Sequence, residues 1–321
     1  MGEFYPNMYV AGDRFLNFSD ARPKDMVIKD WGYDWGKLSG SEIMTGFWCQ
    51  RYNGVETTCI SSEDTCYKFF YSLCGETIDP DNGFTPATSI YYESLKLGIM
   101  REYANTDKGF YLAMLGAHNP HSHTHADLGT IWIFHDGKPV FIDAGTGRYT
   151  RLTFSAERNN LWWIRSDHHN LPTINGKMQG IGTEYVTSDA VYDKNNKTFS
   201  LDLKGAYPAD AEIDTYKRIA TLGDGQVTIT DIVKSNIDGE IQFNYLLNEK
   251  PEFVEDGVFT VHGVKVKYDR SLAFSYDCPD VTMPETVDMP IEWECDKLYR
   301  VSLIGKLEAN KQHKYNVTVT K

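Results

Sequence analysis

The sequence predicts a mainly β protein, a large antiparallel β-sandwich preceded by a short α-helical segment. Beyond about residue 80 the chain is a series of short apolar or alternating runs bounded by turn residues, a pattern typical of strands. Several Asp-Gly pairs between these runs supply the positive φ angles that tight hairpins need. Helical spacing of apolar residues occurs before residue 80, so the predicted domains are a helical segment at 1–80 and a sandwich at 81–321.

Two helices are predicted in the first segment, at residues 41–52 and 63–74, the second with a capping box at Ser61 and Asp64. The apolar residues at helical spacing are Ile43, Met44, Phe47, Trp48 and Tyr52, followed by Cys66, Phe69, Phe70 and Leu73. Two short aromatic-rich helices bury one face only against something else. We therefore expect them to be the end of a longer helical array or a cap on the sheet domain.

The strands expected after Pro86 follow in order. They cover residues 89–92, 110–115, 130–134, 140–143, 199–203, 226–229, 241–247 and 315–319. Hairpin turns are predicted at Asp136-Gly137, Asp224-Gly225 and Asp238-Gly239. The strand at residues 139–143 is expected to fold back on the strand before it and to end at Asp143.

Composition limits the possible partners. The chain has 321 residues, 41% of them hydrophobic, and a formal net charge of −13. This length supports a sizeable core. The acidic balance, without a Lys/Arg cluster longer than two residues, argues against nucleic acid and against an anionic membrane as partners. An anionic sugar stays possible, because a site can be locally positive on an acidic protein.

Targeting signals and cysteines give little further information. No apolar run reaches the roughly 18 residues that span a bilayer, and the first twenty residues lack the order of a signal peptide. The six cysteines are dispersed without C-x-x-C spacing, which argues against a thiolate zinc knuckle. They fit disulfides in an exported protein and reduced thiols in a cytoplasmic one, so the localisation is left open.

Histidine is the most informative residue type, because seven of the nine histidines lie between positions 118 and 169. If His123 and His125 are extended, their side chains share one face, since strand side chains alternate with a period of two. Two neutral imidazoles on one face are half of a divalent-metal site, which Asp143 and the His168-His169 pair could complete. The residues therefore predict a metal site, with zinc favoured by the nitrogen-rich ligand set.

Simpler interpretations compete with this one. Histidines also cluster in exposed loops, Asp143 begins a possible turn, and Asp127 fits a helix or turn cap. The loop between Asp143 and His169 is locally basic and aromatic, with Arg148, Tyr149, Arg151, Arg158 and Arg165. Such a loop could bind a carboxylated sugar, because Arg matches carboxylate geometry bidentately. It could equally be a charged connection with ordinary surface pairs.

The motifs around these residues resemble the heparinase II/III-like family of polysaccharide lyases, which also includes alginate and oligoalginate lyases. The resemblance runs through SHTHADLG at 122–129, DGKPVFIDAG at 136–145, RSDHHN at 165–170 and Asn175-Gly176. The upstream NFSD at 17–20 and YYES at 91–94 also fit the family. Three separated motifs in this order make the resemblance fairly specific, and the general similarity covers most of the chain.

The resemblance implies a role for each candidate residue. It implies that His125, Asp143 and His169 hold a zinc ion, with His123 as a catalytic histidine facing the substrate. Tyr149 is the implied second catalytic residue, and the substrate-binding candidates in the basic loop are Arg148 and Arg158. His168 competes with His169, but the His-Asn pair of the family falls on His169-Asn170. Asp127 could orient a ligand imidazole.

The implied reaction is β-elimination at a uronic acid of an acidic polysaccharide, such as a glycosaminoglycan or alginate. Neutralising the uronate carboxylate should be the main catalytic effect, because the C5 proton beside it is very weakly acidic. Family members carry an α/α toroid before the sandwich, which supplies further catalytic residues. Residues 1–80 are too short for a toroid and resemble its last helices and a linker. The missing toroid is therefore an expected partner, and the activity of the chain alone is left open.

Two other functions stay open. A cupin-like metalloenzyme also uses His-x-His and a later His, but it usually has a Glu a few residues after the pair, where this chain has Asp127, Leu128 and Gly129. The other is a non-catalytic sandwich that a metal stabilises and that binds carbohydrate. Turnover of uronate polymers separates this binding function from a lyase.

Overall fold

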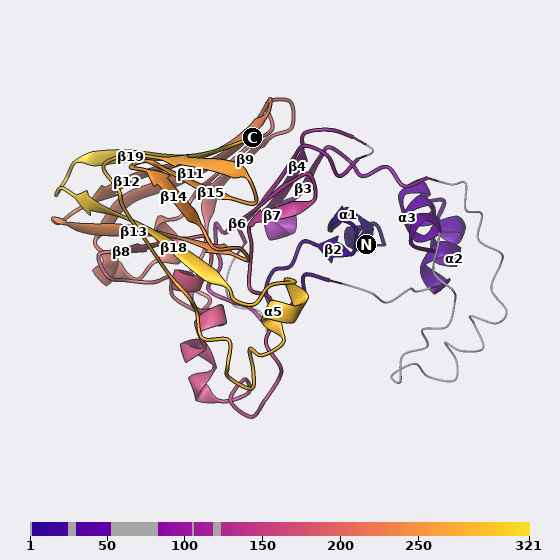
Figure 1. The fold of residues 1–321 in the computed structure, drawn as a ribbon, viewed down its shortest axis with the longest axis horizontal. Coiled ribbons are helices and arrows are strands. Elements are labelled where there is room, and N and C mark those ends of the chain that lie inside the picture. Colours follow the sequence, from indigo (N-terminus) through magenta and orange to yellow (C-terminus); the bar gives the residue numbers. More distant parts are fainter. Residues whose placement is uncertain (1, 25–29, 53–82, 105, 118–122) are drawn as a thin grey trace.

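Strands dominate the structure, and every strand pair within the described residues is antiparallel, which confirms the predicted mainly β class (Figure 1). The computed structural model describes residues 2–24, 30–52, 83–104, 106–117 and 123–321. Among these residues the strands form three larger sheets and one small hairpin, β1 (Tyr9–Ala11) with β2 (Arg14–Phe15).

The three larger sheets have five, eight and four strands. The five-stranded sheet runs β3 (Ser89–Tyr92), β4 (Leu97–Arg101), β5 (Phe110–Leu115), β6 (Ile131–His135) and β7 (Lys138–Phe141). The eight-stranded sheet runs β14 (Glu252–Glu255), β15 (Val258–Val261), β16 (Val264–Tyr268), β19 (Gln312–Thr320), β12 (Gln226–Ser235), β11 (Ile213–Gly223), β10 (Thr198–Asp202) and β9 (Ser188–Asp193). The four-stranded sheet runs β17 (Ala273–Asp277), β18 (Tyr299–Leu307), β13 (Gly239–Leu247) and β8 (Pro172–Ile174).

Two hydrophobic cores hold the sheets together, and β5 contributes to both. Leu112 and Met114 of β5 lie in one core with side chains from the eight-stranded and four-stranded sheets. Tyr111 and Ala113 lie in the other, with the N-terminal segment, α3 (Glu42–Tyr52) and Trp132. Because side chains alternate along a strand, a strand buried on both faces must be apolar at every position, as β5 is.

The described residues contain few helices. The α-helices are α1 (Phe4–Asn7), α2 (Asp30–Ser39), α3 and α5 (Met289–Glu292), and the 3₁₀ helices are η1 (Glu93–Leu95), η2 (Ala156–Asn160), η3 (Trp162–Ile164), η4 (Ser166–His168), η5 (Lys204–Ala206) and η6 (Ala209–Ala211). The predicted helix at residues 41–52 is α3, whereas the predicted helix at 63–74 and the domain boundary near residue 80 lie outside the described residues. No helix in the described ranges is long and apolar enough to cross a membrane.

Two predictions about the strands are wrong. The predicted strand at 139–143 ends earlier, because β7 stops at Phe141 and the Ile142 amide donates to the Leu246 carbonyl of β13, 2.9 Å away. Asp143 therefore lies in a loop two residues beyond the strand. Asp238-Gly239 does not close a hairpin, since β12 pairs with β11 and β19 while β13 pairs with β18 and β8 in another sheet.

The Asp136-Gly137 hairpin is confirmed, with φ of 50° and 74° at the two residues between β6 and β7. Gly137→Ala is expected to lower the free energy of unfolding by about 1–2 kcal/mol, because a Cβ disfavours this left-handed backbone. Chemical denaturation measures the loss. Gly223→Ala is the matched control, since a Cβ there meets only ordinary contacts at 3.7 Å or more. Equal loss in both variants would contradict the conformational explanation.

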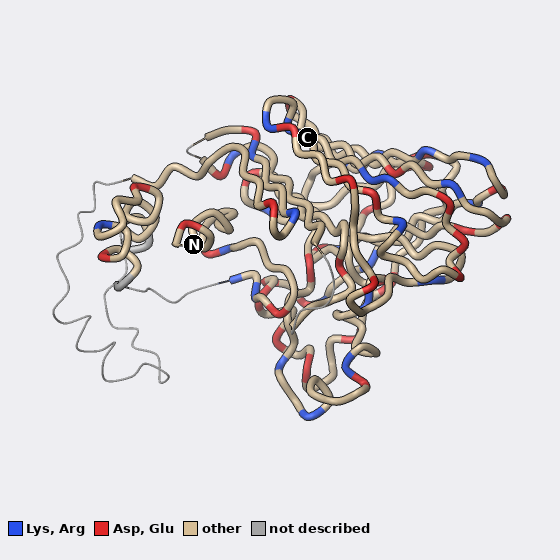
Figure 2. Tube along the Cα trace, turned by 180° about the vertical axis from the view of Figure 1, so that it is seen from behind, with Lys and Arg blue, Asp and Glu red and all other residues tan. Residues whose placement is uncertain are grey.

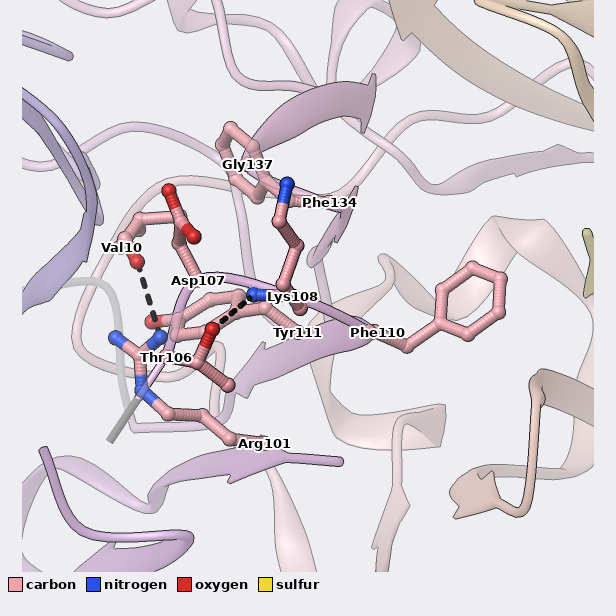
Figure 3. A pocket seen from close by; sticks show the side chains of 10 residues that line it. Val10, Arg101, Thr106, Asp107, Lys108, Phe110, Tyr111, Phe134 and Gly137 are labelled. Atoms are coloured by element: carbon pink, nitrogen blue, oxygen red, sulfur yellow. Dashed lines mark hydrogen bonds between the residues drawn. The ribbon is translucent and has the colours of Figure 1, made fainter. Parts of the chain in front are cut away.

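A buried arginine forms hydrogen bonds between the five-stranded sheet and the N-terminal segment. Arg101 of β4 donates through Nη1 to the Val10 carbonyl at 3.0 Å and through Nη2 to the Tyr9 carbonyl, and its guanidinium lies over the Tyr111 ring (Figure 3). Burial lowers the pKa of Arg101. These contacts hold β1 in place, and the chain leads from there to residues 17–21 at the candidate site.

Charged residues are distributed without segregation by sign. Lys and Arg are interspersed with Asp and Glu along the described trace (Figure 2). One buried ion pair joins Arg218 of β11 and Asp231 of β12, with Arg218 Nε donating to Asp231 at 2.8 Å. Arg218 also donates to the carbonyls of Gly129 and Asn170, at 2.9 and 2.7 Å. The eight-stranded sheet is thereby bonded to both segments that carry the candidate histidines.

Candidate active site

Three residues from separate segments bring ligand atoms together inside the protein. His125 precedes β6, Asp143 follows β7, and His169 lies between η4 and β8. Their potential ligand atoms lie within 4.8 Å of one another, and all three side chains are buried. His169 Nδ1 lies 2.7 Å from Asp143 Oδ2, while Asp143 Oδ1 accepts the Gly145 amide at 2.9 Å. These are the three residues for which the sequence predicted metal binding.

The donor set fits a metal ion. Within the described residues, the buried atoms His125 Nδ1, His169 Nε2 and Asp127 Oδ2 have no hydrogen-bond partner. Buried polar atoms without partners are costly and rare in native proteins. A cation bound by two imidazoles and a carboxylate would remove that cost, and this ligand set suits zinc. Zinc nevertheless remains a prediction.

Electrostatics within the cluster favour a bound cation. Burial alone would raise the pKa of Asp143, but the neighbouring His169 and His125 bring it below its usual value. Burial alone would lower the pKa of His169, yet Asp143 raises it. Asp127 is buried beside them, and its pKa is raised chiefly by that burial. Two carboxyl groups therefore face two imidazoles in a dry environment where interactions between charges are strong.

Asp20 is the residue that the sequence reasoning missed. Its carboxylate lies beside four side chains of the predicted site, His123, His125, Tyr149 and Arg158. Burial alone would raise the pKa of Asp20, but its bonds to the two histidines and Tyr149 bring it well below its usual value. The only sequence feature that pointed to Asp20 was its position in the upstream NFSD motif, for which no function was predicted.

Residues 17–21 reach the site because a glycine makes room for them. Gly145 has φ of 81°, and a Cβ there would lie 3.1 Å from the Ala21 carbonyl oxygen. Asn17 Nδ2 donates to the Asp143 carbonyl at 3.2 Å, and the Thr146 amide donates to the Ala21 carbonyl at 3.3 Å. The N-terminal segment is thus bonded directly to the loop that carries Asp143.

His123 does not share a strand face with His125. It has φ of 71° and lies in a loop, so the extended geometry considered from the sequence is wrong. Its side chain is 55% exposed, in contrast to the buried His125. Tyr149, also largely exposed, has its hydroxyl 3.0 Å from His123 Nδ1, and the exposed Phe154 packs edge-on against its ring. His123 and Tyr149 therefore form the solvent-facing part of the site.

The two substrate-binding candidates, Arg148 and Arg158, already have partners. Arg148 forms a bidentate ion pair with Asp288. Arg158 donates to the Thr124 carbonyl at 2.8 Å and approaches Asp20 at 3.4 Å. The substrate-binding role of both stays a prediction. His168 contacts Asp167 rather than the metal cluster, with 3.0 Å between Nδ1 and Oδ1.

Asn170 holds the segments of the site in register. Its side chain donates to the carbonyls of Ile131 and Ile142, at 2.6 and 2.9 Å, and accepts the Leu246 amide at 2.9 Å. Asn170→Ala leaves these buried groups without partners and should lower the free energy of unfolding by about 2–3 kcal/mol. Denaturant titration measures this, with the exposed Asn160→Ala as control. A loss no larger than in the control would contradict the bonding role.

Comparisons with known proteins agree with this fold. A heparinase III described as the BT4657 gene product has a TM-score of 0.69 at 17% identity, over 99% of this chain and 45% of its own. A heparan sulfate lyase HepC mutant from Pedobacter heparinus scores 0.65 at 13% identity, over 99% and 45%. Another heparinase III scores 0.66 at 12% identity, over 99% and 47%. The chain thus spans less than half the length of these structures.

Sequence comparison identifies the family. None of the curated proteins matches the chain in sequence. The family model described as "Heparinase II/III-like, C-terminal" matches residues 92–279, which is more than half of the chain and includes the candidate metal ligands and both exposed candidate residues. The chain therefore belongs to the heparinase II/III-like family, whose C-terminal domain it carries.

Proposed function

We propose that this chain is the sandwich part of a polysaccharide lyase that cleaves uronic-acid-containing glycans by β-elimination and holds a zinc ion. One observation carries the proposal. The exposed side chains of His123 and Tyr149 lie next to a buried cluster of His125, Asp143 and His169. Structurally similar proteins described as heparinase III and heparan sulfate lyase give the substrate class, an acidic glycan.

The reaction breaks the C4–O bond of a uronate residue, at its glycosidic linkage to the next sugar. A base removes the C5 proton, the electron pair of the C5–H bond forms the C4=C5 double bond, and the departing oxygen takes a proton. His123 would assist the proton transfer. The Tyr149 hydroxyl would stay protonated, because partial burial and its bond to Asp20 raise its pKa.

His125, Asp143 and His169 would hold the zinc ion, which would supply positive charge against the buried carboxylates and fix the two loops that flank the site. His123 is two residues from His125, so a fixed His125 limits the positions available to the catalytic candidate. The buried position of the cluster favours this structural role.

Turnover tests the proposal directly. The protein as its gene encodes it is incubated with heparan sulfate, hyaluronan, chondroitin sulfate and alginate. A lyase releases unsaturated uronate, which absorbs in the ultraviolet. Cleavage without this absorbance would indicate hydrolysis and refute β-elimination. Binding to these polymers without any cleavage would favour the non-catalytic carbohydrate-binding alternative.

A further inference from the structure

We infer that Asp20 is a positioning residue whose carboxylate fixes the ring tautomers of His123 and His125 in opposite senses. It leaves the lone pair of His123 on Nε2, at the surface, and the lone pair of His125 on Nδ1, inside the metal cluster. The role assigned to His123 rests on the proposed function, whereas the role assigned to His125 does not.

The four contacts of Asp20 divide evenly between its two oxygens. Oδ2 lies 2.7 Å from His123 Nδ1 and accepts from the Tyr149 hydroxyl at 2.9 Å. Oδ1 lies 3.0 Å from His125 Nε2 and 3.4 Å from Arg158 Nη2. The carboxylate is only 8% exposed, so water replaces few of these bonds.

This arrangement requires Asp20 to act as an acceptor. An ionised carboxylate offers only lone pairs, and an arginine offers only donors. The guanidinium of Arg158, which faces Oδ1, favours the ionised carboxylate. His123 Nδ1 and His125 Nε2 must therefore both carry hydrogens.

The remaining ring nitrogens follow from the chemistry of imidazole. A neutral imidazole has one N–H and one lone pair, and the group bonded to one nitrogen decides which nitrogen keeps the lone pair. In His123 the lone pair falls on Nε2 of a ring that is 55% exposed. In His125 it falls on Nδ1, the buried atom without a hydrogen-bond partner among the described residues.

Asp20 itself stays outside the candidate metal cluster. The described residues with mutually close ligand atoms are His125, Asp143 and His169 alone. A carboxylate that accepts from the far nitrogen of a metal-binding histidine orients its ring and raises its basicity, and losing it typically costs about 10–100-fold in metal affinity. Asp20 has this relation to His125 and, through its other oxygen, orients the exposed His123.

The backbone around Asp20 keeps the carboxylate in place. The Asp20 amide donates to the His123 carbonyl at 3.2 Å, which bonds the two residues at a second point. Arg158 bonds the Thr124 carbonyl, midway between the two histidines, as well as facing Oδ1. Both imidazoles thus meet a carboxylate whose position is already fixed, which is what a tautomer-setting group needs.

Nuclear magnetic resonance of protein labelled with ¹⁵N-histidine tests the tautomers directly. Two-bond proton–nitrogen spectra of the zinc-loaded chain show which ring nitrogen carries hydrogen, and His123→Gln and His125→Gln assign the signals. We expect a hydrogen on Nδ1 of His123 and on Nε2 of His125. A hydrogen on Nδ1 of His125, or a neutral His123 with its hydrogen on Nε2, would overturn the inference.

Zinc affinity of Asp20→Ala provides a second readout. Alanine removes both acceptor oxygens, so nothing holds the hydrogen of His125 on Nε2. We expect about 10–100-fold weaker zinc binding by competition with a chromophoric chelator. The control is Asp288→Ala, which removes a carboxylate that pairs with Arg148 and should change affinity less than twofold.

Unchanged zinc affinity in Asp20→Ala would overturn the assignment for His125. The spectra of the wild-type chain still decide the question if this variant fails to fold. Neither measurement needs turnover, so a protein that lacks lyase activity but shows the expected tautomers would refute the proposed function and leave this inference standing.

Discussion

Replacing His123 by Ala should lower the rate of unsaturated uronate release by about 10²–10⁴-fold, the range usual for losing a group that transfers a proton or stabilises charge. The expectation follows from position. His123 is the exposed histidine of the site, 3.0 Å from the Tyr149 hydroxyl and 2.7 Å from Asp20. The measurement is the initial rate of absorbance increase, made on the protein as its gene encodes it and at several substrate concentrations.

The division between kcat and KM makes this prediction specific. Loss of a group that acts in the transition state lowers kcat and kcat/KM together, whereas loss of a simple binding contact raises KM alone. His313→Ala on β19, in the eight-stranded sheet, is the control and should keep the wild-type rate. A His123→Ala enzyme with kcat within threefold of the wild type would remove His123 from the mechanism.

The sequence predicted correctly those strands that are determined by their own residues and by the turns beside them. The range 110–115 is β5 because six successive apolar residues suit a strand buried on both faces, and 89–92 is β3 because turn residues bound it. The failures need information from other segments. β7 stops at Phe141 because the next amide finds its acceptor in β13, more than a hundred residues later. The residue pattern of 139–143 does not indicate that Leu246 of β13 is the hydrogen-bond partner.

The site shows the same division. The clustered histidines and Asp143 indicated a metal site, and the family resemblance implied His125, Asp143 and His169 as its ligands, which the structure brings together. Asp20 was not found, because its contacts with His123 and His125 span 103 and 105 residues. One Asp among 45 acidic residues has no local mark of function. Only the fold, which lays residues 17–21 across the Asp143 loop, reveals it.

Replacing a metal ligand should abolish zinc binding. The wild-type chain is expected to hold one zinc ion after purification and dialysis, and His125→Ala and Asp143→Ala less than about a tenth of that, because two remaining ligands do not make a structural site. Elemental analysis of the three proteins, normalised to protein concentration, measures the difference. His168→Ala is the matched control, since His168 is adjacent to His169 in sequence but contacts Asp167.

Metal removal should also destabilise the fold, because a cation that binds only the folded state adds its binding free energy to folding, about 4 kcal/mol when its concentration is a thousand times Kd. Chelation should therefore lower the melting temperature of the wild type and of His168→Ala. Chelation should leave the melting temperature of His125→Ala unchanged, because that variant holds no zinc ion that could be removed. Equal zinc content in all four proteins, or equal sensitivity to chelator, would refute the ligand assignment.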